Sequence, residues 1–153
     1  MKDSNVEALN KRTRTDALIT LLLSGVIAVS TVFQLIVRHE PGKAVSGVFL
    51  FVIFLLTGLI FIDIRKNGKP FAQSVIIKMR VLAVTVCISG FVSQFADCIA
   101  DGIKNHGGEA FPFTFYLDDR HSVYMFLLGV IIGILSEIFV YGHALQNDMD
   151  QIA

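Results

Sequence analysis

A chain of 153 residues has the length of one ordinary domain, but 54% of its residues are hydrophobic and only 17% are charged. This composition, with a mean hydropathy of +0.65, is typical of an integral membrane protein and excludes most soluble classes. Thirteen basic and thirteen acidic residues cancel, so no overall field favours nucleic acid. We therefore expect a membrane protein that makes no direct contact with nucleic acid.

Four long apolar segments follow one another along the chain. They cover residues 17–37, 44–62, 81–99 and 123–141. A helix of about 20 residues rises about 30 Å, which matches the hydrocarbon core of a bilayer. The first segment is too long for the apolar part of a typical signal peptide, and no convincing cleavage site follows it directly. The sequence predicts a single all-α domain, residues 1–153, built as a bundle of four transmembrane helices.

The stretches between these segments carry turn and interface signals. Pro41 and Gly42 predict a tight turn between the first two spans. Gly68 is typical of a helix end and Pro70 of a helix start. Residues 71–80 alternate in polarity at helical spacing, so we expect a short interfacial helix that runs into the third span.

Lysine and arginine gather on one side of the predicted bundle. The N-terminal segment has four and the connector between the second and third spans has five, whereas the opposite side has only Arg38, Lys43, Lys104 and Arg120. The positive-inside rule therefore places both termini and the connector in the cytoplasm. The connector residues singled out as candidate interaction or structural residues are Arg65, Lys66, Lys69, Pro70, Phe71 and Arg80.

Small and polar side chains within the spans indicate the faces that avoid lipid. In the first span, such residues lie within about 120° of a helical wheel and should turn inward; they are Thr20, Ser24, Ala28, Thr31 and Gln34. In the fourth span, Gly129 and Gly133 form a small-xxx-small pattern that lets two backbones approach closely. We expect this pattern to serve packing within the chain, with dimerisation as the alternative.

Glu137 lies inside the fourth apolar segment, near its cytoplasmic end. A carboxylate at this position reaches the headgroup region, pairs with Arg80 or Lys78, or is held protonated by desolvation as a functional group. We favour the first two interpretations, in which Glu137 is structural.

Asp97 belongs to the polar outer half of the third span. Together with Asp118 and His121 it has the chemistry of a cation site, but the spacing matches no strong ligand motif, so no metal is expected. No catalytic set of residues is recognisable either, so we expect neither an enzyme nor a cofactor.

Two short motifs carry a resemblance to a known family. One is Asn67-Gly68-Lys69-Pro70-Phe71 with Met79-Arg80 downstream, and the other runs from Tyr141 to Gln146 and on to Ile152. They resemble domain-of-unknown-function family 2975, small bacterial inner-membrane proteins with four predicted helices. The resemblance implies a membrane protein that influences, or is controlled by, a cytoplasmic helix-turn-helix regulator, and it implies no catalytic residues.

These observations predict a regulatory or interaction protein whose connector and tail, including Leu145 and Gln146, contact a cytoplasmic partner. The alternative is a small-solute transport or immunity-type protein that acts as an oligomer, for example through the fourth span. A third possibility is that the connector only fixes topology and binds anionic headgroups, at about 1 kcal/mol for each basic residue.

Overall fold

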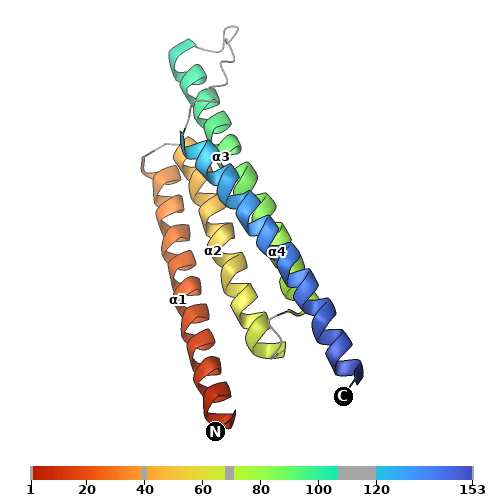
Figure 1. The fold of residues 1–153 in the computed structure, drawn as a ribbon. Helices are drawn as coiled ribbons and strands as arrows, with labels where there is room; N and C mark the ends of the chain where they lie inside the picture. The colour runs from red at the N-terminus through yellow and green to blue at the C-terminus, as the bar shows by residue number, and fades with distance from the viewer. Residues whose placement is uncertain (1, 39–40, 68–70, 107–119, 153) are drawn as a thin grey trace.

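The computed structural model describes residues 2–38, 41–67, 71–106 and 120–152 and consists of four long helices (Figure 1). These are α1 (Lys2–Ile36), α2 (Pro41–Asn67), α3 (Gln73–His106) and α4 (Arg120–Ile152). Each contains a stretch of 24 to 28 residues that is long and apolar enough to cross a membrane. No strand occurs among the residues described. The predicted all-α bundle of four transmembrane helices is confirmed.

The α1–α2 turn is shorter than the sequence predicts. Pro41 and Gly42, expected to form the turn itself, are the first two residues of α2, so that prediction is wrong. The physical reason is that proline suits the first helical position: its φ is already helical, and its missing N–H would have had no partner there.

The α2–α3 connector leads directly into a long helix. The short interfacial helix expected at residues 71–80 forms the first turns of α3, which begins at Gln73 and continues without interruption to His106. Val75 N–H donates to the carbonyl of Ala72 at the start of this helix (2.9 Å). The expected helix end at Gly68 and helix start at Pro70 lie outside the described residues.

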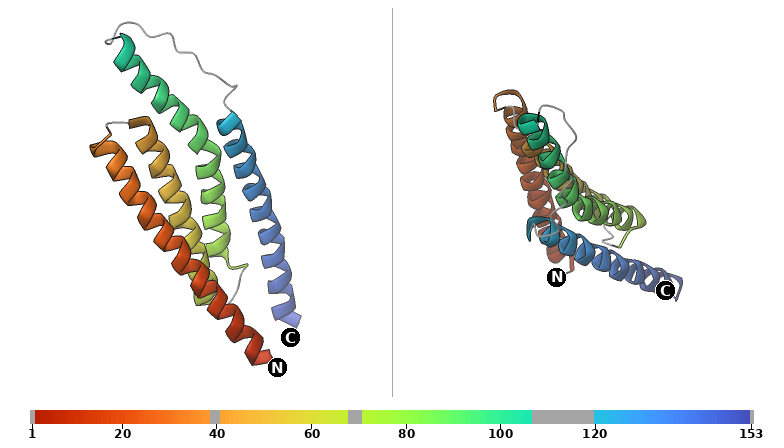
Figure 2. Two further views of the ribbon diagram at one scale, coloured as in Figure 1. Left: turned by 90° about the vertical axis from the view of Figure 1, so that its left-hand side faces the viewer. Right: turned by 90° about the horizontal axis from the view of Figure 1, so that it is seen from above.

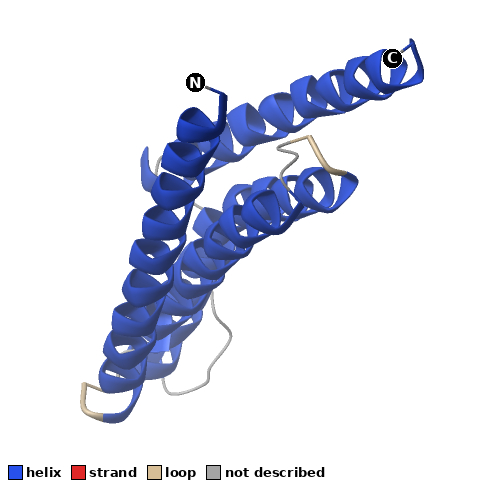
Figure 3. Ribbon diagram, turned by 90° about the horizontal axis from the view of Figure 1, so that it is seen from below, coloured by secondary structure: helices blue, strands red, loops and turns tan. Residues whose placement is uncertain are grey.

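The helices pack in the order of the sequence. α1 lies against α2, α2 against α3 and α3 against α4. The described backbones of α1 and α4 do not contact each other, and the two helices run in clearly different directions (Figures 2 and 3). Both termini and the α2–α3 connector lie at one end of the bundle, which we call the connector end (Figure 1). The opposite end, where α2 and α4 begin, is called the loop end.

The α1·α2 interface is built from the polar stripe of the first span. Thr20, Ser24 and Thr31 are buried, and each hydroxyl donates to a backbone carbonyl three or four residues earlier on its own helix. The predicted inward face of α1 is therefore confirmed. On α2 the stripe meets glycines: a Cβ on Gly47 would lie 3.1 Å from Thr31 Cβ, and one on Gly58 3.0 Å from a methyl carbon of Leu21.

The apolar core lies between α2, α3 and α4. It contains Ile60, Val75, Leu82 and Val86, with partly buried residues such as Phe139 packed against it. α3 is the most buried span, with 39% of its most apolar stretch buried, against 17% for α1 and 11% each for α2 and α4. Because α3 is the helix that holds most of the core, the other helices present broad apolar faces to the bilayer.

The α3·α4 interface is a close backbone approach. A Cβ on Gly129 would lie 2.7 Å from the amide nitrogen of Cys87 and 2.8 Å from the carbonyl oxygen of Ala83. Nearer the loop end, a Cβ on Gly90 would lie 2.7 Å from Ser122 Cα. By contrast, a Cβ on Gly133 would make only an ordinary contact with Ala83, at 3.9 Å. Gly129 thus serves packing within the chain, as small residues commonly do between membrane helices.

Candidate functional site

Two ion pairs join α3 to its neighbours at the connector end. Lys78 on α3 pairs with Asp63 on α2, and the two side chains are 29% and 19% exposed. Arg80 Nη2 donates to Glu137 Oε1 on α4 at 2.8 Å, and these side chains are 53% and 57% exposed. Of the two cations considered for Glu137, it is therefore Arg80 that pairs with it. Together the pairs form a charge belt across three helices, at the boundaries of the apolar segments of α2 and α3 and near the connector end of that of α4.

Phe71 connects the α2–α3 connector to α4. Its ring lies edge-to-face against Phe139, with the centroids 5.1 Å apart. One turn further along α4, the absence of a side chain at Gly142 makes room for the same ring, because a Cβ there would lie 2.8 Å from two ring carbons. The two motifs that carry the family resemblance thus touch through an aromatic contact.

α4 continues well beyond the charge belt. The 15 residues from 138 to 152 remain helical after Glu137 and rise about 22 Å. Tyr141, Leu145 and Met149 are spaced four residues apart on this extension and are 73%, 65% and 68% exposed. We call these three residues the α4 stripe. Residues four apart share one face of a helix, so the stripe is a continuous exposed apolar surface.

The charge around the α4 stripe is negative. Asp148 is exposed beside it, and no lysine or arginine occurs between Glu137 and the last residue of the chain. No ion pair between Asp148 and the basic connector is found in the portion of the chain that the structure describes. The extension is therefore an acidic amphipathic helix.

The structure brings together only some of the connector residues that the sequence analysis singled out as candidates. Arg65 and Lys66 are exposed at the end of α2, whereas Lys69 and Pro70 lie outside the described residues. Phe71 and Arg80 both contact α4, as described above. On α4, Leu145 is exposed within the stripe, and Gln146 is partly buried, with its side-chain Oε1 buried and without a hydrogen bond.

Asp97 lies far from this cluster, on the loop-end half of α3, and is exposed. Among the residues the structure describes, no group of three His, Cys, Asp or Glu side chains is arranged to hold a metal ion. The cation site considered in the sequence analysis also included Asp118 and His121. Asp118 and the side chain of His121 lie outside the described part of the chain.

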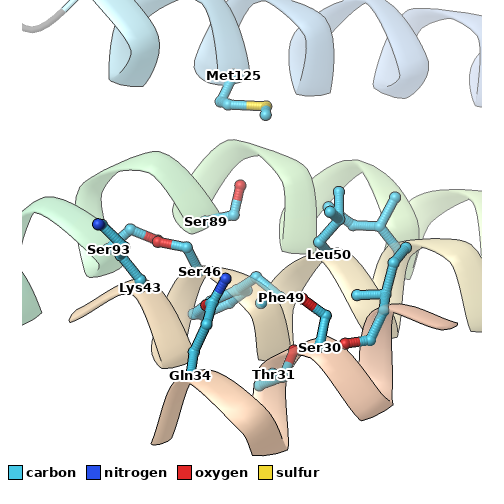
Figure 4. A pocket seen from close by; sticks show the side chains of 13 residues that line it. Ser30, Thr31, Gln34, Lys43, Ser46, Phe49, Leu50, Ser89, Ser93 and Met125 are labelled. Atoms are coloured by element: carbon cyan, nitrogen blue, oxygen red, sulfur yellow. Dashed lines mark hydrogen bonds between the residues drawn. The ribbon is translucent and has the colours of Figure 1, made fainter. Parts of the chain in front are cut away.

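A cavity of about 380 Å³ lies toward the loop end, bounded by side chains of all four helices (Figure 4). Ile27, Ser30, Thr31 and Gln34 line it from α1, and Met125 faces it from α4. The remaining lining residues belong to α2 and α3 and include Lys43, Ser46, Gly47, Phe49, Leu50, Ile53, Ser89 and Ser93. The cavity lies where α1, packed on α2, and α4, packed on α3, do not contact each other.

Sequence reasoning missed this cavity. It identified Thr31 and Gln34 as inward-facing but treated the loop-end cation Lys43 only as a topology signal. The available signal was the set of serines at Ser30, Ser46, Ser89 and Ser93, each within or beside an apolar run. No single span reveals that these serines converge, because they come from three helices.

Comparison of the chain with known proteins finds no matching protein family, no matching curated protein and no matching solved structure. The structure itself establishes a multi-pass membrane protein. The resemblance to family 2975 stays a prediction, and any more specific function depends on the geometry described above.

Proposed function

We propose that this chain is a membrane-embedded interaction protein whose α4 extension binds a cytoplasmic protein. The observation that carries the proposal is the α4 stripe: Tyr141, Leu145 and Met149 are exposed on a helix that continues past the charge belt. The proposal takes the connector end as cytoplasmic, which the distribution of lysine and arginine favours. An amphipathic helix that offers apolar residues at this spacing suits the helix-in-groove mode of recognition.

The charge of the extension favours a protein over the membrane surface as the occupant. A helix that lies on an anionic leaflet normally carries lysine and arginine on its polar face. The extension carries Asp148 and Asp150 instead and has no lysine or arginine. We therefore expect a partner with an apolar groove and a basic rim.

The contact of Phe71 with Phe139 and Gly142 supports a role for the connector in presenting the stripe. It fixes the direction in which α4 leaves the bundle, because the ring is held over one face of the helix. A helix held in one orientation loses less entropy on binding than a free tail would. The resemblance to family 2975 supports a helix-turn-helix regulator as the partner, and the basic surface of a DNA-binding protein fits the acidic extension.

The apolar core at the connector end is our reason for proposing an interaction protein rather than small-solute transport. A transport route through a single copy would need polar groups across the whole bundle, but the described core at the connector end is apolar, with Ile60, Val75, Leu82 and Val86. Transport would therefore require a route between copies of the chain, and Gly129, the residue best suited to join two copies, already packs against α3.

The test uses the full-length chain in its native membrane, with a photo-crosslinking amino acid at position 145, 149 or 147. Asn147 is exposed about 120° around the helix from the start of the stripe, so it serves as the matched control. We expect an adduct with one cytoplasmic protein from positions 145 and 149 but not from 147. The purified partner should bind the Leu145→Glu, Met149→Glu double variant at least tenfold more weakly than Asn147→Glu. Adducts with lipid alone, or equal binding by both variants, would overturn the proposal.

A further inference from the structure

We infer that the loop-end cavity binds a neutral lipid alcohol, meaning a molecule that joins one or more hydroxyl groups to an alkyl chain. The cavity has about 380 Å³ of space, within the range of small-molecule sites, and all four helices contribute to its walls. Such a ligand is independent of the cytoplasmic partner proposed above, because the α4 stripe lies at the other end of the bundle.

Ser93 brings a buried hydroxyl without a partner to the cavity wall. The residue is 8% exposed, and no hydrogen bond of its hydroxyl is found within the described part of the chain. The other buried serines and threonines that the structure describes have partners: Thr20, Ser24, Thr31, Ser89 and Ser136 donate to a carbonyl of their own helix, and Ser122 also has a partner. An unpaired hydroxyl is costly in an apolar environment. Ser93 therefore offers a hydrogen bond that a molecule in the cavity can complete.

Gln34 on α1 adds a second unpaired polar group. Its side chain extends from α1 into the cavity (Figure 4), and no hydrogen bond of its amide is found among the residues described. A serine hydroxyl and a glutamine amide can both donate and accept. The hydroxyls of Thr31 and Ser89 already donate to backbone carbonyls of their own helices, both at 2.8 Å, so they can only accept. An alcohol matches this mixed wall because its oxygen both donates and accepts, whereas an ester oxygen only accepts.

The groups that remain for a ligand are neutral. Lys43 also lines the cavity, but it already has an interaction partner of its own. Ser93 and Gln34 carry no charge. A charged ligand would lose its hydration without gaining a free counter-charge from a described lining residue, and this loss is costly in a low-dielectric site. A neutral alcohol avoids that cost.

The deeper wall of the cavity is apolar and suits an alkyl chain. Ile27 and Ile53 lie about 10 Å deeper than Gln34 and Ser46 by helical rise, and Leu50 lies between the two levels. A bound water needs two to four polar partners, which this deeper wall does not supply. The described backbones of α1 and α4 make no contact, so an alkyl chain can enter from the bilayer without crossing a helix–helix interface.

The test uses three probes that share one alkyl chain and differ in the head group. The full-length chain is purified in lauryldimethylamine oxide, a detergent without hydroxyl groups, and titrated with monoolein, methyl oleate or oleate. Monoolein carries hydroxyl groups, methyl oleate carries none and oleate carries a negative charge. Bound molecules are counted by native mass spectrometry. We expect a single molecule of monoolein to bind at least about fivefold more tightly than methyl oleate or oleate, since the gain is that of one or more neutral hydrogen bonds.

Two variants and one control test the place of binding. Ser93→Ala removes the unpaired hydroxyl, so it should weaken monoolein binding about fivefold and leave methyl oleate binding unchanged, which also reports that the chain is folded. Leu50→Trp fills the apolar part of the cavity and should weaken the binding of both. Thr85→Ala is the matched control: Thr85 lies on the same helix but not in the cavity wall, and its hydroxyl donates to the carbonyl of Val81 at 2.8 Å. It should leave both probes unaffected.

The inference is overturned if methyl oleate binds as tightly as monoolein, because hydroxyl groups are then not recognised. Tighter binding of oleate would overturn it as well, because charge would then select the ligand. An equal loss in Thr85→Ala and Ser93→Ala would place the site elsewhere, and the absence of any bound probe would mean that water alone occupies the cavity.

Discussion

The two outer helices are attached to the bundle in different ways, although glycine is central to both interfaces. At α3·α4, Gly129 faces the backbone atoms of Ala83 and Cys87. At α1·α2, Gly47 and Gly58 face side-chain atoms of Thr31 and Leu21. A side chain can rotate away from an added methyl group, whereas a helical backbone cannot move without shifting the whole helix. We conclude that α4 is rigidly placed by its packing and that α1 is attached by a more adaptable interface.

The difference matters for the α4 stripe and for the loop-end cavity. A rigid α4 gives the α4 stripe a fixed position at the connector end. An adaptable α1, which forms one wall of the loop-end cavity through Ser30, Thr31 and Gln34, lets the cavity change its shape. The comparison can be tested by substitutions at the glycines and at the charged belt.

The largest effect is expected from Gly129→Ala. The new Cβ would lie within 3 Å of two backbone atoms of α3, so the helices must separate. We expect a loss of about 1 to 3 kcal/mol in the free energy of unfolding, the usual cost of overpacking. The measurement is unfolding of the full-length chain in mixed micelles. Gly133→Ala is the matched control one turn away, where the Cβ has room, and it should be neutral or slightly stabilising.

A smaller effect is expected from Gly47→Ala, because the added methyl group meets the side chain of Thr31. We expect a loss of about 1 kcal/mol, near the low end of overpacking costs. Thr31→Ala in the same chain should recover most of that loss, since it removes the atoms in the way. If the double variant is as unstable as the sum of the two single variants, the contact is not the adaptable one described here.

The smallest effect is expected from Glu137→Gln. Glu137 and Arg80 are both more than half exposed, and ion pairs of this kind contribute about 0.2 to 1 kcal/mol. Asp63→Asn should cost more, because Asp63 is only 19% exposed and Lys78 would lose its partner in a drier environment. Comparing the two unfolding midpoints at low and high salt checks this ranking. If Glu137→Gln lowers the free energy of unfolding more than Gly129→Ala does, the charge belt rather than glycine packing holds α4 in place.

The sequence predicts local features of the fold well. The number of helices and the inward face of α1 follow from hydrophobic runs and helical periodicity. The choice of Arg80 as a possible partner of Glu137 also came from the sequence, since both residues lie at the same predicted membrane boundary. The error at Pro41 is of a different kind: proline-glycine pairs are compatible with a turn and with a helix start, and a local signal does not separate the two.

The sequence by itself therefore determined that this protein lies in a membrane, how many spans it has and which face α1 turns inward. The reason is that lipid excludes unpaired polar groups from each helix separately. Only the tertiary structure decided that Phe71 lies over Gly142, that Gly129 faces the backbone of α3, and that Lys43 shares a cavity with serines from three helices. These features depend on how the helices are ordered and how far they are shifted along one another. In lipid that arrangement is set by close packing between surfaces, which no single helix specifies.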